Sequence, residues 1–386
     1  MPLCDDRALE SMNSKPRILH VNKLYHPCIG GVETVLQNLA EGIASRCEQD
    51  ILVCQPRGPA RREVVNGVRV TRAGSLGIWW SMPVSLSYPF TFRNMVSQCH
   101  LVHLHHPFPL GELSSLAYGG GVKTVLTWYS AIVRQKNLAR FYRPFLERLL
   151  DRVDAITLIF PGAERSSAVL EPFAHKCHVI PPGIEVAQYE LDGGLKEEAE
   201  KLRSRYEGNL ILFAGRLVYY KGLQHLIAAM PDVNGQLLIV GDGPLRDQLR
   251  LLTAQKGVSD RVHFLGKMDD RKLKAAFHAC DVFVLPSTHP SEAFGMVQLE
   301  AMACGKPVVN TNVPTGVPYV SLHGETGLTV EVGDSRALAS AIGKLLADGE
   351  LRRTLGENGR RRVLREFTVQ TMAERTFQLY EKVLAG

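Results

Sequence analysis

Short apolar runs alternate along the chain with longer stretches in which apolar residues recur at helical spacing. The short runs predict buried strands, and the longer stretches predict amphipathic helices. In the first half, strands are predicted at residues 18–21, 51–54, 101–104, 124–127, 155–159 and 179–180, with a helix over 32–46 and a hairpin over 64–71. In the second half, strands are predicted at 210–214, 237–240, 262–265, 282–285 and 308–309, and helices at 221–230, 245–255, 271–279, 335–346, 350–365 and 368–384.

This alternation predicts an α/β protein with two parallel sheets, one in each half of the chain. The run Pro181-Pro182-Gly183 interrupts the series, so we expect a first domain over residues 16–183 and a second over 184–365. Residues 1–15 are polar and are expected to form a disordered lead-in. Ligands of open parallel sheets bind beyond the carboxyl ends of the strands, so the chemistry is expected where two such sheets face each other.

Composition narrows the class of protein. The formal charge of +6 is modest for 386 residues and suits anionic ligands or membrane headgroups without demanding nucleic acid. No RNA-binding aromatic motif and no zinc-finger spacing occurs in the sequence, so we expect no nucleic-acid partner. Eight scattered cysteines fit reduced thiols in a cytoplasmic protein, and no apolar run approaches the ~18 residues of a membrane-spanning helix.

The most informative segment is the one around Glu292 and Glu300. An apolar run, a Pro/Ser turn that carries Glu292, and a helix opened by Gly295 follow one another here. A helix start exposes unpaired N–H groups and favours an anion, and glycine lets a ligand approach them. The two carboxylates would flank that anion, one holding sugar hydroxyls and the other ribose hydroxyls. This layout suits a nucleotide whose diphosphate carries a sugar.

The pair Glu292 and Glu300, with Phe294-Gly295 between them and Glu-Ala-Met-Ala-Cys-Gly-Lys-Pro-Val-Val from residue 300 on, resembles the donor-site signature of glycosyltransferase family 4. The similarity runs from about residue 20 to about residue 367, and the second half is the closer match. It implies the GT-B fold, in which two Rossmann-like domains with parallel sheets face each other. It also implies that the C-terminal helix, residues 366–386, crosses back to the first domain.

The resemblance assigns further residues to the donor site. Arg216 and Lys221 follow a buried strand and match the family's pair of cations, which would meet the negative charge on the leaving phosphate. With Glu292 they form the expected catalytic set. The expected donor-binding set is Gly30, Gly31, Gly215, Gly243, Phe294, Gly295, Met296, Val297 and Glu300. Because no Asp-x-Asp motif or metal-ligand spacing is found in the sequence, we expect no metal and no other cofactor.

The sequence departs from the family on the acceptor side. Close relatives usually read Trp-His-Ser-Asp where this chain has Trp128-Tyr129-Ser130-Ala131. Tyrosine, with a pKa near ~10, is a poor base near pH 7. The family's mechanism lets the leaving phosphate accept the acceptor's proton, so this loss need not abolish activity. The remaining acceptor-side candidates are His105, His106, Arg134 and Lys136.

Together these features predict a metal-independent, retaining hexosyltransferase. GDP-mannose is the favoured donor and a UDP-hexose the second choice, with a saccharide or lipid-linked saccharide as acceptor in the synthesis of lipopolysaccharide or another cell-surface polysaccharide. The basic stretch 134–152, with its interleaved aromatic residues, could place the protein on the inner face of the cell membrane. The alternative is a nucleotide-sugar-binding pseudoenzyme or partner subunit, in view of Tyr129 and Ala131.

Overall fold

The computed structural model describes residues 15–28, 30–79, 82–130, 136–165 and 167–386, with only the backbone of 136–140. The chain forms two compact units. The first contains the residues before Pro181 together with Val369–Gly386, and the second contains Pro181–Thr368. The division therefore falls a few residues from the predicted positions 183 and 365. Apart from Lys15, the predicted lead-in lies outside the described residues.

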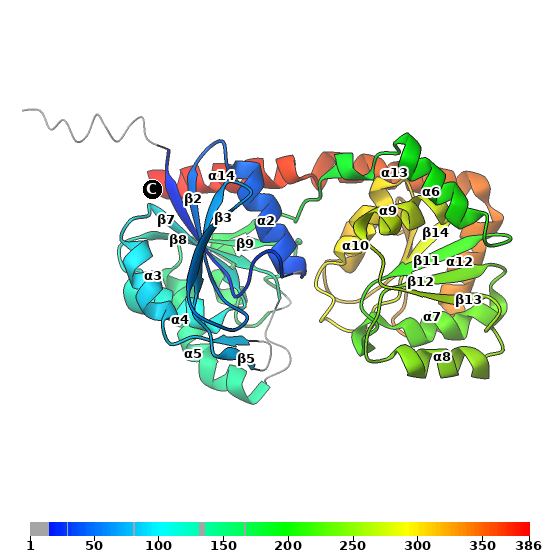
Figure 1. Ribbon diagram of the computed structural model, residues 1–386, viewed down its shortest axis with the longest axis horizontal. Helices are drawn as coiled ribbons and strands as arrows, with labels where there is room; N and C mark the ends of the chain where they lie inside the picture. Colours follow the sequence, from blue (N-terminus) through cyan, green and yellow to red (C-terminus); the bar gives the residue numbers. More distant parts are fainter. Residues whose placement is uncertain (1–14, 29, 80–81, 131–135, 166) are drawn as a thin grey trace, which may run out of the picture. The chain divides into compact units, whose positions relative to one another are not determined.

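The first unit is built on an eight-stranded sheet with the order β10-β9-β8-β7-β1-β2-β4-β3 (Figure 1). All neighbouring strands in it run parallel except β3 and β4, which form the predicted hairpin around Asn66-Gly67. Its strands are β1 (Arg17–Val21), β2 (Glu48–Cys54), β3 (Arg61–Val65), β4 (Val68–Ala73), β7 (Leu101–His106), β8 (Lys123–Trp128), β9 (Ala155–Leu158) and β10 (Cys177–Val179). A separate small hairpin consists of β5 (Gly77–Trp79) and β6 (Met82–Val84).

Helices cover both faces of this sheet. One face packs an aliphatic and aromatic core, with Leu104 and Phe92 among its members, beneath α3 (Tyr88–Val96), α4 (Pro109–Tyr118) and α5 (Lys136–Arg152). The other face packs against α2 (Gly31–Ile43). The C-terminal helix α14 (Val369–Ala385) contacts α2 and β8 and so belongs to the first unit, together with the 3₁₀ turn η1 (Glu171–Lys176).

Three histidines replace aliphatic residues on the sheet face beneath α14. His20 on β1 pairs in register with His103 on β7, and His105 follows two residues later on the same side of that strand. All three side chains are buried. His103 bonds to the Tyr380 hydroxyl of α14 at 2.5 Å and to Thr127 at 2.7 Å, and His105 bonds to Tyr129 at 2.9 Å. The bond between His103 and Tyr380 joins the C-terminal helix to the sheet.

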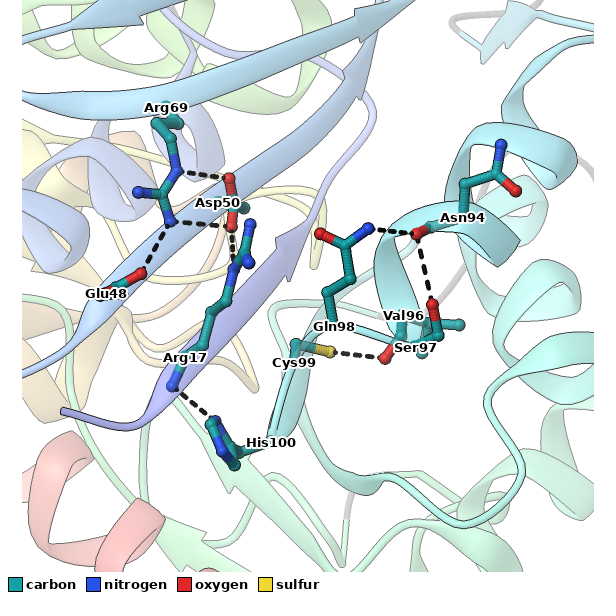
Figure 2. Close-up of polar contacts among 10 residues, drawn as sticks. All are labelled: Arg17, Glu48, Asp50, Arg69, Asn94, Val96, Ser97, Gln98, Cys99 and His100. Carbon is teal, nitrogen blue, oxygen red and sulfur yellow. Dashed lines mark hydrogen bonds and ion pairs between the residues drawn. The ribbon is translucent and has the colours of Figure 1, made fainter. Parts of the chain in front are cut away.

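A charged cluster ties the opposite ends of the strands together (Figure 2). The Asp50 carboxylate on β2 accepts bonds from Arg17 on β1 at 2.7 Å and from Arg69 on β4 at 2.9 and 3.1 Å. Burial alone would raise the pKa of Asp50, but the hydrogen bonds from Arg69 and Arg17 outweigh burial and lower it. The cluster therefore holds three neighbouring strands in register at the edge away from the expected site.

The second unit is built on a six-stranded parallel sheet with the order β13-β12-β11-β14-β15-β16 (Figure 1). Its strands are β11 (Leu210–Ala214), β12 (Gln236–Val240), β13 (Val262–Gly266), β14 (Val282–Leu285), β15 (Val308–Thr311) and β16 (Gly327–Val330). β11 and β14 match the prediction residue for residue, whereas β16 was not predicted. Both faces of the central strands are buried, which is why they read as continuous apolar runs.

Helices again cover the two faces. Core residues such as Phe213, Ile239 and Val284 pack beneath α7 (Leu223–Ala229), α8 (Arg246–Gln255) and α12 (Ser335–Ala347). The remaining helices are α6 (Gly193–Arg203), α9 (Asp270–Ala279), α10 (Met296–Ala303), α11 (Val317–Val320) and α13 (Gly349–Glu366), with 3₁₀ turns η2 (Val186–Tyr189), η3 (Tyr219–Lys221) and η4 (Met230–Asp232). In the described part of the chain, no helix is both long and apolar enough to cross a membrane.

The predicted start of one helix was wrong. A continuous helix from Lys221 was expected, but Gly222 adopts a left-handed conformation with φ of 67°, and α7 starts only at Leu223. A β-carbon at Gly222 would lie 1.8 Å from the carbonyl oxygen of Pro286, so only glycine fits against that turn. The break places Lys221 in the 3₁₀ turn η3, outside the helix.

The layer formed by the buried side chains of His20, His103 and His105, called the histidine layer below, predicts that the first unit loses stability in mild acid. Burial lowers the pKa of His20 to about 4, and burial together with neighbouring imidazoles holds the pKa values of His103 and His105 well below their usual range. The unfolded chain takes up these protons below about pH 6.5, whereas the folded chain does not. Stability should therefore be complete above pH 6.5 and fall towards pH 4, by on the order of 3 kcal/mol for His20 alone.

Urea unfolding between pH 7.5 and 5 would measure this loss. All three tryptophans precede residue 181, so their fluorescence follows the first unit. Replacing His20 by Gln should flatten the pH dependence, because one depressed group is removed. Replacing the exposed His100 by Gln is the control and should leave the pH dependence unchanged. Equal pH dependence in His20→Gln and the unmodified chain would contradict the assignment.

Candidate active site

A buried ion pair lies at the centre of the candidate site in the second unit. The Lys221 ammonium is 2.5 Å from the Glu292 carboxylate, and the two side chains are only 12% and 10% exposed. Lys221 follows β11 and Glu292 follows β14, two strands that pair directly in the sheet. The structure thus brings together two of the three predicted catalytic residues at the carboxyl ends of adjacent strands.

The turn after β14 fixes the position of Glu292. Ser287 donates a hydrogen bond to the carboxylate oxygen that Lys221 also contacts, at 3.2 Å. Thr311 in turn donates to the Ser287 carbonyl. The other oxygen of Glu292 accepts no bond from any residue that the structure describes, so it can receive a ligand hydroxyl. Ser287 was not predicted, because a serine in a Pro/Ser turn carries no signal of its own.

The third predicted catalytic residue, Arg216, lies at the end of β11 and is exposed. Its backbone carbonyl accepts a bond from the Val218 N–H group, but its side chain has no hydrogen-bond or ion-pair partner among the described residues, so the guanidinium is free to meet an anion. Gly215 and Gly243 lie in the turns after β11 and β12. A β-carbon at Gly243 would lie 2.5 Å from the Leu217 carbonyl oxygen. Glycine is therefore required at position 243 because the two turns pack closely against each other.

Helix α10 begins directly after Gly295, as predicted. Gly295 caps the helix in a left-handed conformation with φ of 74°, and a β-carbon there would lie 2.7 Å from Leu285 and Gln298. Helix geometry leaves the N–H groups of Met296 and Val297 without intrahelical acceptors. The Phe294 side chain is buried against Phe367, so only its backbone could meet a ligand. These N–H groups and the helix dipole favour a phosphate.

Polar residues in the core hold this helix start in place. Gln298 donates to the carbonyls of Phe294 and Val317, and it accepts a bond from Asn310 at 2.9 Å. Both amide side chains are fully buried. Neither residue was singled out from the sequence, because a polar residue in a helix, such as Gln298, or at the end of a strand, such as Asn310, reads as an exposed position until its neighbours are known.

Glu300 lies one turn into α10 and is half-buried. Loss of water around its carboxyl raises the pKa of Glu300 to about 7, with the negative charge of Asp270 adding to the shift and Lys274 and Lys221 opposing it. Lys274 is itself held by Asp270 at 2.5 Å and by Gln188 at 3.1 Å. The carboxyl therefore changes charge near neutral pH, an environment typical of functional sites.

The acceptor-side candidates lie in the first unit, and most are buried. The His105 ring bonds to the Tyr129 hydroxyl, and Tyr129 is only 7% exposed. His106 is stacked on Trp128 with ring centres 4.0 Å apart and bonds to the buried Glu112 at 2.9 Å. The tyrosine hydroxyl that replaces the family's histidine is therefore already engaged. Ala131 and Arg134 lie outside the described residues, as does the side chain of Lys136.

The predicted glycine pair, Gly30 and Gly31, forms the start of α2 in the first unit. Gly30 is the cap residue, and the Glu33 carboxylate lies over it, with one oxygen 2.2 Å from the position that a β-carbon would take. Outside the backbone of α2 and the two neighbouring residues, no described atom lies within 4 Å of a β-carbon built on Gly31. The predicted phosphate-binding helix start thus already carries a carboxylate of its own chain.

His20, His103 and His105 also bring one ring nitrogen each within 4.8 Å of the others, which is close enough to consider a metal ion. Sequence spacing did not reveal this cluster, because two of its members lie on one strand and the third lies on its neighbour. Both nitrogens of His103 already bond to hydroxyl groups, and His20 lies 3.4 Å from His105, nitrogen to nitrogen. The cluster therefore fits a hydrogen-bonded core better than an open coordination site.

Comparison with known proteins agrees with this geometry. Residues 30–183 match the family model of a glycosyl transferase 4-like domain, and residues 196–362 match that of glycosyl transferases group 1. The O-antigen chain mannosyltransferase C of Escherichia coli is 32% identical over 95% of this chain and 99% of its own. The D-rhamnosyltransferase WbpZ of Pseudomonas aeruginosa is 32% identical over 91% of this chain and 92% of its own.

Solved structures share the fold. The sucrose-phosphate synthase of Thermosynechococcus elongatus superimposes with a TM-score of 0.78 at 25% identity, covering 96% of this chain and 100% of that one. The predicted α/β architecture of GT-B type, with Rossmann-like parallel sheets, is thereby confirmed. The sequence matches, the fold and the two motifs with Lys221 and Glu292 lead to one conclusion: the chain belongs to the GT-B glycosyltransferases of family 4 type.

Proposed function

We propose that this glycosyltransferase moves a hexose from a nucleotide-diphosphate sugar to a saccharide or lipid-linked saccharide with retention at the anomeric carbon. Mannose from GDP-mannose is the preferred donor. The observation that carries the proposal is the pairing of Lys221 with Glu292 beside the free Arg216, at the carboxyl ends of adjacent strands. Cations placed there meet the charge that develops on a leaving diphosphate.

The donor is bound by the second unit. Its diphosphate lies at the start of α10, where the N–H groups of Met296 and Val297 and the helix dipole receive negative charge. Arg216 and Lys221 supply the positive charge. Lys221 keeps its bond to Glu292, and its remaining N–H donors face the phosphate. Two cations at this point perform the task that a metal ion performs in other transferases, so the reaction proceeds without metal and without another cofactor.

The two glutamates divide the rest of the donor between them. Glu292 accepts hydrogen bonds from hydroxyls of the transferred sugar through its free carboxylate oxygen. Glu300, in its ionised form, accepts hydrogen bonds from the ribose hydroxyls. In the chemical step, the bond between the anomeric carbon and the phosphate oxygen breaks while the acceptor oxygen bonds to the same face of that carbon. The acceptor's proton passes to the leaving phosphate, so the step needs no histidine at position 129.

The names of similar proteins support mannose and a cell-surface acceptor. Besides the O-antigen enzyme, a GDP-mannose-dependent phosphatidylinositol monomannoside mannosyltransferase of Mycobacterium tuberculosis is 30% identical over 60% of this chain. A peripheral position on the inner membrane face is supported by helix α5, where Phe141 and Phe145 are 77% and 53% exposed beside the exposed Arg143 and Arg148. Exposed aromatic and cationic side chains together suit an anionic lipid surface.

Transfer assays test the function directly. We expect the purified chain to transfer radiolabelled mannose from GDP-mannose to a lipid extract or an oligosaccharide, and to do so equally in the presence of a metal chelator. Changing Tyr129 to Phe should lower the rate only slightly, because its hydroxyl bonds to His105 and takes no part in proton transfer. Tight donor binding without transfer or donor hydrolysis for any acceptor would instead identify a nucleotide-sugar-binding pseudoenzyme or partner subunit.

Variants of the ion pair between Lys221 and Glu292 should separate the effect on turnover from the effect on stability. Lys221→Ala should reduce turnover by orders of magnitude, and it should also destabilise the second unit by about 3 kcal/mol, because Glu292 is left as a buried unpaired charge. The double variant Lys221→Met with Glu292→Gln should regain much of that stability while remaining inactive. Thermal unfolding and single-turnover transfer measure the two effects. Full activity in either variant would remove Lys221 from the catalytic set.

The raised pKa of Glu300 predicts that the affinity for the donor depends on pH. Its pKa of about 7 means that the carboxyl is mostly protonated at pH 6 and mostly ionised at pH 8. Because the ionised form accepts more hydroxyl bonds, affinity for GDP-mannose should rise several-fold across this range. GDP-mannose is the right ligand, since both of its phosphates stay ionised throughout. Titration calorimetry should show that Glu300→Gln binds more weakly at pH 8 and has lost the pH dependence, whereas Glu325→Gln, an exposed control, keeps it.

A further inference from the structure

A cavity of about 530 Å³ lies in the first unit between the hairpin β3–β4 and helix α3. Its lining includes Arg17, Asp50 and Arg69, which stand near the amino ends of β1, β2 and β4. Ligands of parallel sheets bind at the carboxyl ends of the strands, so this cavity is separate from the acceptor-side candidates. Its volume falls within the ~300–1,000 Å³ of pockets that hold small molecules.

The lining of this cavity carries more positive than negative charge, because it contains three arginines and two carboxylates. Asp50 is bound by two of these arginines at 2.7 and 2.9 Å, and Glu63 is bound by Arg72 at 2.6 Å. The third arginine of the lining is Arg62, whose side chain forms no hydrogen bond or ion pair with any described residue. Its guanidinium is therefore free to bind an anion.

The two arginines that hold Asp50 also keep N–H groups for a ligand. Arg17 bonds to Asp50 through Nε alone, so its terminal nitrogens make no hydrogen bond to a described residue. Arg69 bonds to Asp50 through Nε and one terminal nitrogen, and its other terminal nitrogen makes no bond to a described residue. A guanidinium has five N–H donors, so the cluster that holds the strands in register still offers donors to the cavity.

A structural role accounts for Arg17 and Arg69 but not for Arg62. Charged side chains on an edge strand such as β3 prevent pairing with another chain, and they do so from the solvent side. Arg62 instead lines the cavity, and it pairs in register with Thr71 of β4, which lines the same cavity. Its position therefore adds positive charge to the cavity beyond what the Asp50 cluster requires.

The opposite wall of the cavity is polar but uncharged (Figure 2). Asn94 and Gln98 lie there, at the end of α3 and just beyond it. Gln98 donates to the backbone carbonyl of Asn94 at 3.2 Å, which leaves its amide oxygen available, and the Asn94 amide makes no hydrogen bond to a described residue. Val70 and Met95 add apolar surface to the lining. Amides beside a small apolar surface suit the hydroxyls and the C–H face of a sugar.

We propose that this cavity binds a sugar phosphate, with the phosphate on Arg62, Arg17 and Arg69 and the sugar against Asn94 and Gln98. A phosphate monoester is close to a dianion at neutral pH and has three acceptor oxygens, which matches several guanidinium groups. A phosphodiester, as in a phospholipid or a nucleic acid, carries a single charge and two large substituents, so it matches less well. The proposed donor site lies in the second unit, and this inference does not depend on it.

Titration calorimetry with mannose 6-phosphate at physiological salt tests the cavity. The unmodified chain should bind it, whereas mannose and inorganic phosphate should each bind weaker by about tenfold or more, because each makes only part of the contacts. Arg62→Gln should weaken binding by about tenfold or more, since one charge-assisted contact is lost. The matched control is Arg57→Gln, which changes another exposed arginine whose side chain has no partner among the described residues and should bind like the unmodified chain.

Two further variants locate the ligand. Arg216→Gln changes the phosphate-binding arginine proposed for the second unit and should leave binding of mannose 6-phosphate unchanged. Asn94→Leu should weaken binding of mannose 6-phosphate but not the weaker binding of inorganic phosphate, because only a sugar contact is lost. Tryptophan fluorescence follows the first unit, and it should show that mannose 6-phosphate raises the melting temperature of the unmodified chain but not that of Arg62→Gln. Without ligand, the two should melt alike, because Arg62 is exposed and its side chain is unpaired.

The possible results separate this inference from the proposed function. No binding by the unmodified chain, equal losses in Arg62→Gln and Arg57→Gln, or equally tight binding of inorganic phosphate would each overturn the inference. Binding that is lost in Arg216→Gln and kept in Arg62→Gln would place the ligand in the second unit and overturn it as well. Failure to transfer sugar to any acceptor, with binding of mannose 6-phosphate still dependent on Arg62, would overturn the proposed function and leave this inference standing.

Discussion

The ion pair between Lys221 and Glu292 is the constraint on which the second unit's site depends. It joins the turns that follow β11 and β14, and the sheet holds these strands side by side. Because both side chains are nearly buried, neither charge can be removed without leaving the other unpaired. Gly222 makes the pair possible by ending η3 against Pro286, which keeps Lys221 out of α7. The proposed catalytic role of these residues and the stability of the turn are therefore linked through one contact.

The two units place polar groups in their cores for different purposes. In the second unit, Gln298 and Asn310 bond to each other and to backbone carbonyls, and they fix the helix start at which we propose that the donor's phosphate binds. In the first unit, His103 and His105 bond to hydroxyl groups from β8, from the turn after it and from α14. That layer replaces hydrophobic packing beneath the C-terminal helix, and it keeps the imidazoles neutral because burial disfavours their charged form.

Much of the fold could be predicted from the sequence, because parallel strands buried on both faces read as continuous apolar runs. For this reason, both ends of the strands at residues 210–214 and 282–285 were predicted correctly. α6 was missed because its sequence is dominated by charged residues, and the short β16 was missed because it begins at a glycine. The motif around Glu292 and Glu300 could be recognised because its residues are close in sequence.

The remaining features depend on tertiary neighbours. The left-handed Gly222 follows from a carbonyl 64 residues away, and the histidine layer follows from the register of β1 with β7. The placement of Lys221 is a further case, because Gly222 and Pro286 set it and helix periodicity does not. The described side chain of Arg216 pairs with no carboxylate, so the turn after β11 carries positive charge beyond what Glu292 neutralises. An excess of positive charge at this point suits the anionic donor that we propose.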